Sequence, residues 1–289
     1  MAEPLRIALA GLGTVGTGVI ELLAANRSTI ERRAGRPLEI VAVNARDRAR
    51  DRGVDLSPYA WVDDMQAMAQ RQDVDVVVEL VGGSDGPALT LARSAFDAGK
   101  GLVTANKAMV AHHGLELAEA AAIHNAPFAF EAAVAGGIPV LKGLREGTAA
   151  NALTRIYGIL NGTCNYVLSE MEQTGADFDE MLSAAQDKGY AEADPAFDIE
   201  GVDAAHKLAI LAGIGFGARV GGTMVKALTR GEPLTAAQHR RINKDQGVGE
   251  EDREEEEDRR RRRARSRGGK SEQGDQKRCA YGMPDRLPV

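Results

Sequence analysis

The sequence has little cysteine and no long apolar run. Cys164 and Cys279 are the only two cysteines in 289 residues; they lie far apart, and no CxxC spacing occurs. The chain is therefore not expected to hold a disulfide framework or a zinc site, and a reducing compartment is favoured. No apolar segment approaches the roughly 18 residues that a membrane-spanning helix needs. The prediction is that the chain is not a membrane protein.

An export signal and a histidine cluster are missing as well. The first residues, "MAEPLRIALAGLG", lack the basic region and the following apolar stretch of a signal peptide, so the cytoplasm is the expected location. His112 and His113 are adjacent, which on a helix points their side chains about 100° apart. Neither has a second histidine four residues away, so metal chelation by this pair is not expected.

Most of the first 220 residues alternate short apolar segments with helical stretches such as 14–32, 86–98 and 109–124. The apolar segments show no alternation in polarity, which is typical of strands buried on both faces of a parallel sheet. They read "RIALAG", "LEIVAV", "VDVVVELVG", "GLVTA" and "PFAFEA". The predicted class is α/β with right-handed crossovers.

The last part of the chain, 221–289, has a different composition. It carries 17 Lys and Arg against 13 Asp and Glu, whereas residues 1–220 carry 19 against 29. The run "GVGEEDREEEEDRRRRRARSRGGKSEQGDQKR" has almost nothing to bury, so 244–280 is predicted to be disordered or, at most, a single charged helix. A solvated tail is favoured over nucleic-acid binding, because the acidic block competes for the arginines.

A glycine triplet follows the first predicted strand. Gly11, Gly13 and Gly16 have the G-x-G-x-x-G spacing at the start of a helix. In that context the first glycine makes a tight turn, the second lets the backbone approach a pyrophosphate, and the third permits close helix packing. Dinucleotide binding is predicted; the alternative is a tight turn without a ligand.

The residues that follow later strands bear on the cofactor and the substrate. Arg46 follows the second strand, where a basic residue favours NADP through its 2′-phosphate. The neighbouring acid Asp47 and a longer spacing than usual leave NAD open. Thr104, Asn106 and Lys107 stand at the end of a later strand, where ligands of parallel sheets bind. Lys107 is expected to contact cofactor or substrate, or to be a surface lysine.

Five blocks occur in order between about residues 5 and 219: "GLGTVG", "TANKAMVA", "FEAAVAGGIPVLKGLREG", "RIYGILNGTCNYVLSEM" and "GYAEADPAFDIEGVDAAHKLAIL". Together they closely resemble homoserine dehydrogenase, the NAD(P)-dependent oxidoreductase that interconverts aspartate 4-semialdehyde and homoserine. The resemblance implies a Rossmann-type doubly wound parallel sheet at 1–130 and an α+β substrate and dimerisation domain at 131–220. It also implies a homodimer and a place in threonine, methionine and isoleucine biosynthesis.

The resemblance assigns roles to individual positions. The cofactor contacts would fall on Gly11, Leu12, Gly13, Thr14, Val15, Arg46, Thr104 and Lys107. A homoserine contact would fall on Glu192 and the proton donor would be Lys207. A sodium ion would be bound, mostly through main-chain carbonyls, by Glu131, Val134, Gly136 and Ile138.

The chemistry of such a site fits further residues. Negative charge develops on the semialdehyde oxygen as hydride arrives, and a positioned ammonium such as that of Lys207 can stabilise and protonate it. Asp203, four residues earlier on the same helical face, can hold that ammonium. The substrate's own ammonium calls for carboxylates, which Glu192, Asp198 and Asp203 can supply. Its carboxylate would meet the predicted start of a helix at Asn161, Gly162 and Thr163.

The Asp203 and Lys207 pair also has a simpler interpretation. Acid–base pairs four residues apart are common on exposed helices and contribute only about 0.3 to 0.5 kcal/mol. The helix around this pair is, however, apolar nearly all round, and such a helix is predicted to be buried. A lysine on it then needs a reason, which the catalytic role supplies.

After about Val220 the likeness to the family stops. A C-terminally truncated or frameshifted reading frame is the hypothesis, so the second domain is expected to be incomplete, the homodimer doubtful, the stability marginal and the activity weak. Two other functions stay open. The chain could be another Rossmann oxidoreductase acting on a different amino acid, or a catalytically impaired fragment that only binds nucleotides or a partner.

Overall fold

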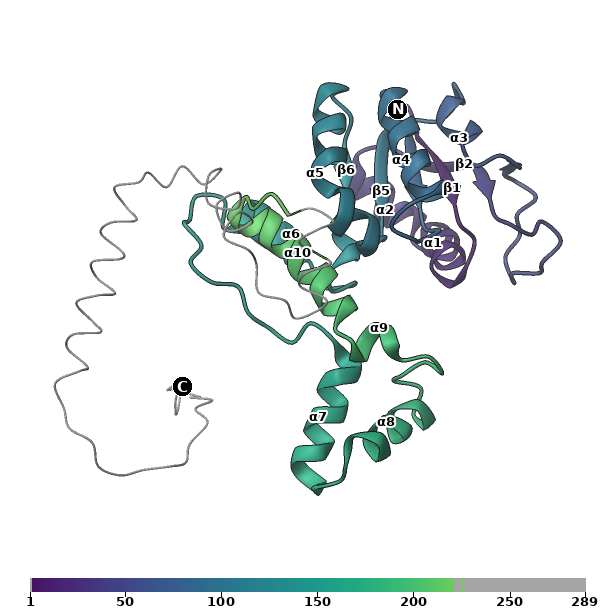
Figure 1. Ribbon diagram of the computed structural model, residues 1–289. Helices are drawn as coiled ribbons and strands as arrows, with labels where there is room; N and C mark the ends of the chain where they lie inside the picture. The colour runs from purple at the N-terminus through teal and green to yellow at the C-terminus, as the bar shows by residue number, and fades with distance from the viewer. Residues whose placement is uncertain (1, 221–224, 226–289) are drawn as a thin grey trace, which may run out of the picture. The chain divides into compact units, whose positions relative to one another are not determined.

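The computed structural model describes residues 2–220 and Val225 (Figure 1). The predictions of a charged tail at 221–289 and of disorder at 244–280 fall, apart from Val225, outside these residues. Among the described residues, no helix combines the length and the apolar character that crossing a membrane requires.

The first part of the chain builds a six-stranded parallel sheet with strand order β3-β2-β1-β4-β5-β6. The strands are β1 (Leu5–Ala10), β2 (Leu38–Asn44), β3 (Ala60–Trp61), β4 (Val76–Glu79), β5 (Gly101–Thr104) and β6 (Phe128–Ala129). The helices between them are α1 (Thr14–Ala25), α2 (Arg27–Ala34), α3 (Ala67–Gln70), α4 (Pro87–Asp97) and α5 (Lys107–Ile123). This is the predicted doubly wound α/β fold.

The strand order reverses beside β1. The chain runs outward from β1 to β3, then returns to pair β4 with the other side of β1 and continues to β6. In open parallel sheets the carboxyl ends of the strands at such a switch point form a binding crevice. The residues just after β1, β4 and β5 are therefore the ones that the fold itself places at a ligand site.

Both faces of the sheet are covered, as the unalternating apolar runs predict. One face packs α4 and α5 on small strand residues, including Ala8 and Ala10, which are fully buried and let the helices approach closely. The other face packs Leu9 and Val43 against Ile20 of α1. Burial on two faces explains why these strands read as continuous apolar segments.

Two details of the predicted elements were wrong. The expected helix at 14–32 is divided in two, because α1 ends at Ala25 and α2 starts after Asn26. The short strand β3 was not predicted, since only Ala60 and Trp61 take part and two residues give no periodic signal.

The residues after β6 are helical where they are regular. They form the 3₁₀ helix η1 (Glu131–Ala133), α6 (Val140–Lys142), the π-helix η2 (Gly143–Gly147), α7 (Gly162–Thr174), α8 (Phe178–Asp187), α9 (Ala196–Ile199) and α10 (Val202–Phe216). No strand occurs among the described residues after Ala129, and 152–161 have no regular secondary structure. Helix α10 packs against α5 of the first part, with Val110 and Ala111 buried beside Ala209 and Ile210. This packing places the start of α10 next to the carboxyl end of β5.

Candidate active site

The glycine triplet lies at the switch point, between β1 and α1. Gly11 has φ +98°, and a Cβ there would lie 2.6 Å from the carbonyl oxygen of Leu80. A Cβ on Gly16 would lie 2.0 Å from the carbonyl oxygen of Gly11. These two glycines are therefore required by the fold whether or not a ligand binds.

Gly13 differs, because a Cβ there would meet no protein atom within 4 Å. It is the N-cap residue of α1, and its lack of a side chain leaves the amides of the first turn uncapped. Among the neighbours, Leu12 is buried and Val15 is 58% exposed. Open backbone, a free helix N-terminus and an exposed apolar residue fit a dinucleotide whose pyrophosphate approaches the main chain.

Arg46 lies two residues beyond the carboxyl end of β2 and is exposed. Sequence reasoning missed its neighbour Arg52, whose Nε donates to the carbonyl oxygen of Leu12 at 3.1 Å. The Arg52 guanidinium also lies 5.8 Å from the centre of the Trp61 ring. Arg52 thus ties the loop that carries Arg46 to the glycine loop, a contact across 40 residues that no local motif indicates.

A cavity of about 490 Å³ opens at the carboxyl ends of β4 and β5. The main chain after β4, the start of α5, helix α9 and the second turn of α10 line it. The lining residues are Gly82, Gly83, Ser84, Ala105, Asn106, Lys107, Ala108, Phe197 and His206. A smaller cavity of about 140 Å³ adjoins Val15, Leu80 and Val81. Lys107 is thus on the wall of the larger cavity, as its position after β5 indicates.

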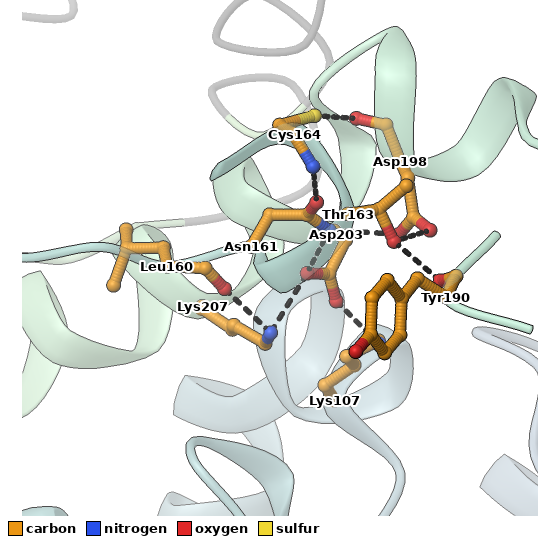
Figure 2. Close-up of polar contacts among 9 residues, drawn as sticks. All are labelled: Lys107, Leu160, Asn161, Thr163, Cys164, Tyr190, Asp198, Asp203 and Lys207. Atoms are coloured by element: carbon orange, nitrogen blue, oxygen red, sulfur yellow. Dashed lines mark hydrogen bonds and ion pairs between the residues drawn. The ribbon is translucent and has the colours of Figure 1, made fainter. Parts of the chain in front are cut away.

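Asp203 joins two lysines from different parts of the chain (Figure 2). Lys107 Nζ donates to Oδ1 at 2.5 Å and Lys207 Nζ donates to Oδ2 at 2.7 Å. Asn161 Nδ2 also donates to Oδ2, at 2.9 Å. The Asp203 side chain is only 4% exposed. Burial acts to raise its pKa, but the hydrogen bonds from Lys107, Lys207 and Asn161 outweigh burial and lower that pKa below 3.8.

Lys207 is partly buried, with 20% of its side chain exposed. Its ammonium also donates to the carbonyl oxygen of Leu160 at 2.6 Å, so two of its three N–H groups are used within the described residues. The surrounding helix α10 is less buried than its composition predicts, since Leu208 is 38% exposed. The Asp203–Lys207 pair is nevertheless not a surface pair, because the carboxylate is buried and bound by a third charged group.

The beginning of α7 is held by Asp198. Asn161 caps α7 by accepting from the amide of Cys164 at 2.8 Å, while its Nδ2 donates to Asp198 Oδ1 at 2.7 Å. Thr163 Oγ1 lies 2.9 Å from both Asp198 Oδ2 and the carbonyl oxygen of Tyr190. The predicted helix start at Gly162 is confirmed, and the structure brings Asp198 and Thr163 into contact with the Asn161–Asp203 group.

Glu192 is not brought into this group. Its carboxylate is exposed and makes no hydrogen bond or ion pair within the described part of the chain; only its carbonyl oxygen is engaged, by Gln186 Nε2 at 3.1 Å. Thr104 is 1% exposed and its hydroxyl donates to Glu79, so its side chain is engaged within the protein rather than open to the predicted cofactor contact.

Two histidines form a pair that the sequence did not indicate. His112 Nε2 and His206 Nε2 are 3.3 Å apart, and His206 is buried. Burial, then the charges of His112 and Lys107, lower the pKa of His206 from 6.5 to about 4, so it is neutral at pH 7. In the described residues, groups of three or more His, Cys, Asp or Glu that could hold a metal do not occur.

The predicted sodium ligands lie around η1. Both carboxylate oxygens of Glu131 accept main-chain amides, from Leu141 at 3.0 Å and from Lys142 at 3.0 Å. Within the described residues Glu131 has no cationic side-chain partner. Val134 is buried, whereas Gly136 and Ile138 are exposed. Oxygen donors suit a hard ion by their chemistry, but here the Glu131 carboxylate already accepts two amides and the Ile138 carbonyl accepts the amide of Val140.

Comparison with protein families gives two matches along the chain. The model described as the NAD-binding domain of homoserine dehydrogenase matches residues 11–131, and the homoserine dehydrogenase model matches 139–260. The second match continues beyond Val220, where the likeness was predicted to stop, although 221–224 and 226–260 lie outside the described residues.

Comparison with individual proteins finds relatives of the same family. Homoserine dehydrogenases from Synechocystis and Pseudomonas aeruginosa are 48% and 47% identical over 217 and 215 residues, each match covering 74% of this chain and 49% of the relative. The chain thus spans about half the length of these relatives. A solved homoserine dehydrogenase from Thiobacillus denitrificans superposes with TM-score 0.70 at 46% identity, covering 75% of this chain and 50% of that one.

Two archaeal structures are covered more fully. The putative homoserine dehydrogenase of Archaeoglobus fulgidus has TM-score 0.64 and 32% identity, with 73% of this chain and 68% of that chain matched. A hyperthermophilic archaeal homoserine dehydrogenase in complex with NADPH has TM-score 0.65 and 25% identity, with 74% and 70% matched.

Proposed function

The chain belongs to the homoserine dehydrogenase family, and we propose on that premise that it interconverts aspartate 4-semialdehyde and homoserine with NADP(H). The observation that carries the proposal is the Lys107–Asp203–Lys207 group beside the cavity at the carboxyl ends of β4 and β5. Bound NADPH would supply the hydride; the residues of the chain would bind the substrate and move the proton.

Lys207 is proposed as the proton donor to the semialdehyde oxygen. Its ammonium is fixed by Asp203 and by the carbonyl oxygen of Leu160, which leaves one N–H for the substrate. Asp203 keeps the ammonium charged and oriented, so the developing negative charge meets a donor that needs no rearrangement. Lys107, on the cavity wall, is proposed to contact both cofactor and substrate.

The substrate's amino acid group would be bound by the residues near the start of α7. We propose that Asp198, held by Asn161 and Thr163, and Glu192 receive the substrate ammonium. The amide of Gly162 would face its carboxylate, whereas the single O–H of Thr163 is already directed at Asp198 or the carbonyl oxygen of Tyr190. The exposed Glu192 carboxylate makes no hydrogen bond or ion pair with the residues that the structure describes, so binding the substrate would not require breaking such a contact.

We propose that the cofactor is bound through the glycine loop at 11–16, with its 2′-phosphate on Arg46. The open backbone at Gly13 and the exposed Arg46 support this assignment. The proposed cofactor residues lie within 1–130 and most of the proposed substrate residues within 131–220. We therefore propose a nucleotide-binding domain at 1–130 and a substrate domain at 131–220, in line with the family matches at 11–131 and from 139 onward.

A spectrophotometric assay tests the function and the cofactor together. The purified chain should reduce NADP when homoserine is added. Arg46→Ala should lower the affinity for NADP about ten- to hundredfold, the effect of losing one charged hydrogen bond, and leave the affinity for NAD unchanged. The exposed Arg33→Ala is the matched control and should change neither cofactor.

The other results of this assay are equally informative. Binding of NADP without turnover of homoserine would contradict the proposed reaction and favour a nucleotide-binding protein. Turnover of a different amino acid would indicate another oxidoreductase. An Arg46→Ala variant that keeps its preference for NADP would exclude Arg46 as the 2′-phosphate contact.

We also propose a sodium ion at Glu131, Val134, Gly136 and Ile138. A sodium ion there should raise the midpoint of thermal unfolding relative to choline at equal ionic strength, because an ion that binds the folded state stabilises it. The rise should be absent in Glu131→Ala. Equal midpoints in sodium and choline for the unaltered chain would refute the site.

A further inference from the structure

Glu79, the last residue of β4, is a fully buried carboxylate that the proposed reaction does not use. Its Oε1 accepts from the amides of Val81 at 2.7 Å and Gly82 at 3.0 Å. Its Oε2 accepts from Thr104 Oγ1 at 2.5 Å. Within the described residues it forms no ion pair with Lys, Arg or His. Burying an acid that has only neutral hydrogen-bond donors lowers the stability of the fold, so Glu79 is a candidate for a functional role.

The hydrogen bonds of Glu79 continue into a closed ring. Glu79 and Thr104 are register partners at the ends of β4 and β5. Thr104 Oγ1 accepts from the amide of Asn106 at 2.9 Å, and Asn106 Nδ2 donates to the carbonyl oxygen of Gly83 at 2.7 Å. The ring therefore ties the loop after β4 to the loop after β5, through side chains rather than strand pairing.

This ring supplies part of the wall of the 490 Å³ cavity. Gly82 and Gly83 line it with φ of +87° and +89°, a left-handed backbone that favours glycine. Asn106 also caps α5 by accepting from the amide of Met109 at 3.0 Å. Lys107, the next residue, begins that helix and reaches Asp203. A shift of the ring would move the 81–83 loop and Lys107 together.

We propose that Glu79 is a positioning residue for the nicotinamide half of the cofactor. It touches no ligand; its carboxylate fixes the 81–83 loop and, through Thr104 and Asn106, the origin of Lys107. The inference rests on the proposed function, which places nicotinamide chemistry at this cavity. The adenosine half is proposed to bind elsewhere, at the 11–16 loop and Arg46, so loss of Glu79 affects one half of the cofactor selectively.

The test compares a whole cofactor with its adenosine half. Calorimetric titration of the purified chain with NADPH and with adenosine 2′,5′-bisphosphate gives both affinities. Glu79→Gln should weaken NADPH about tenfold or more and leave the bisphosphate within about twofold, the size expected for losing charged hydrogen bonds. Thr104→Val removes only the bridging hydroxyl. It should lower the ratio of the NADPH affinity to the bisphosphate affinity, as Glu79→Gln does. Glu172→Gln, at an exposed glutamate, is the matched control and should change neither affinity.

Each other outcome is decisive. Unchanged NADPH affinity in Glu79→Gln, or equal loss of both ligands in a folded variant, overturns the positioning role. If Glu79→Gln does not fold, Thr104→Val decides by the same ratio. A parent chain that binds NADPH but does not oxidise homoserine overturns the proposed reaction and leaves the ratio measurable. A parent chain that binds no NADPH overturns both.

Discussion

Replacing Lys207 by methionine should lower homoserine-dependent turnover by at least about a hundredfold, the lower end of what a positioned general acid contributes. Methionine keeps the length and apolar stem of lysine but has no ammonium. The affinity for NADPH should stay the same, because Lys207 bonds to Asp203 and Leu160 and does not line the cavity where Lys107 lies. Steady-state kinetics and calorimetric titration separate the two effects.

The control for Lys207→Met is Lys188→Met, which alters an exposed lysine of the same part of the chain. That variant should keep turnover within about twofold, as surface changes away from a site usually do. Lys207→Met with near-normal turnover would exclude Lys207 as the proton donor. If Lys107→Met lowered turnover and Lys207→Met did not, Lys107 would be the proton donor instead.

The sequence was sufficient for the elements whose signal is local. β1, β2 and β5 are where the apolar runs place them, and the glycine triplet, the helix start at Gly162 and the Asp203–Lys207 spacing are all short-range patterns. In each case the residues that interact lie within a few positions of one another, so periodicity and spacing were enough.

What the sequence could not predict depends on the packing of α10 against α5. Lys107 meets Asp203 across 96 positions and His112 meets His206 across 94, so neither contact has a local signature. The hydrogen bond between Glu79 and Thr104 could not be predicted for a related reason. An acid at the end of an apolar run indicates the end of a strand, and only the register of β4 with β5 shows Thr104 beside it.

Because Asp203 is buried, we expect both the stability of the fold and the proposed activity to depend on it. Two ammonium groups and one amide converge on a carboxylate that is 4% exposed. If the charge of that carboxylate is removed, Lys107 and Lys207 repel each other across a neutral group. Both lysines keep some exposure and can turn toward solvent, so the cost should lie below the 3 to 5 kcal/mol typical of a broken buried pair, at about 2 kcal/mol.

We therefore expect Asp203→Asn to lower the free energy of unfolding by about 2 kcal/mol at pH 7 and to lower turnover at least about a hundredfold, since Lys207 loses its orientation. Urea unfolding and the homoserine assay measure the two losses. The exposed Asp187→Asn serves as the control and should change neither.

The pH dependence gives Asp203→Asn a second, independent signature. Because the folded-state pKa of Asp203 is lower than its ordinary value of 3.8, its ionised form favours the folded state. That contribution is fully present above pH 3.8 and is lost as the pH falls through the lower, folded-state pKa. The stability difference between the unaltered chain and Asp203→Asn should hence stay constant from pH 7 to about pH 5 and shrink below pH 4. A difference that stays unchanged down to pH 3 would mean that the carboxylate charge is not what holds the two lysines in place.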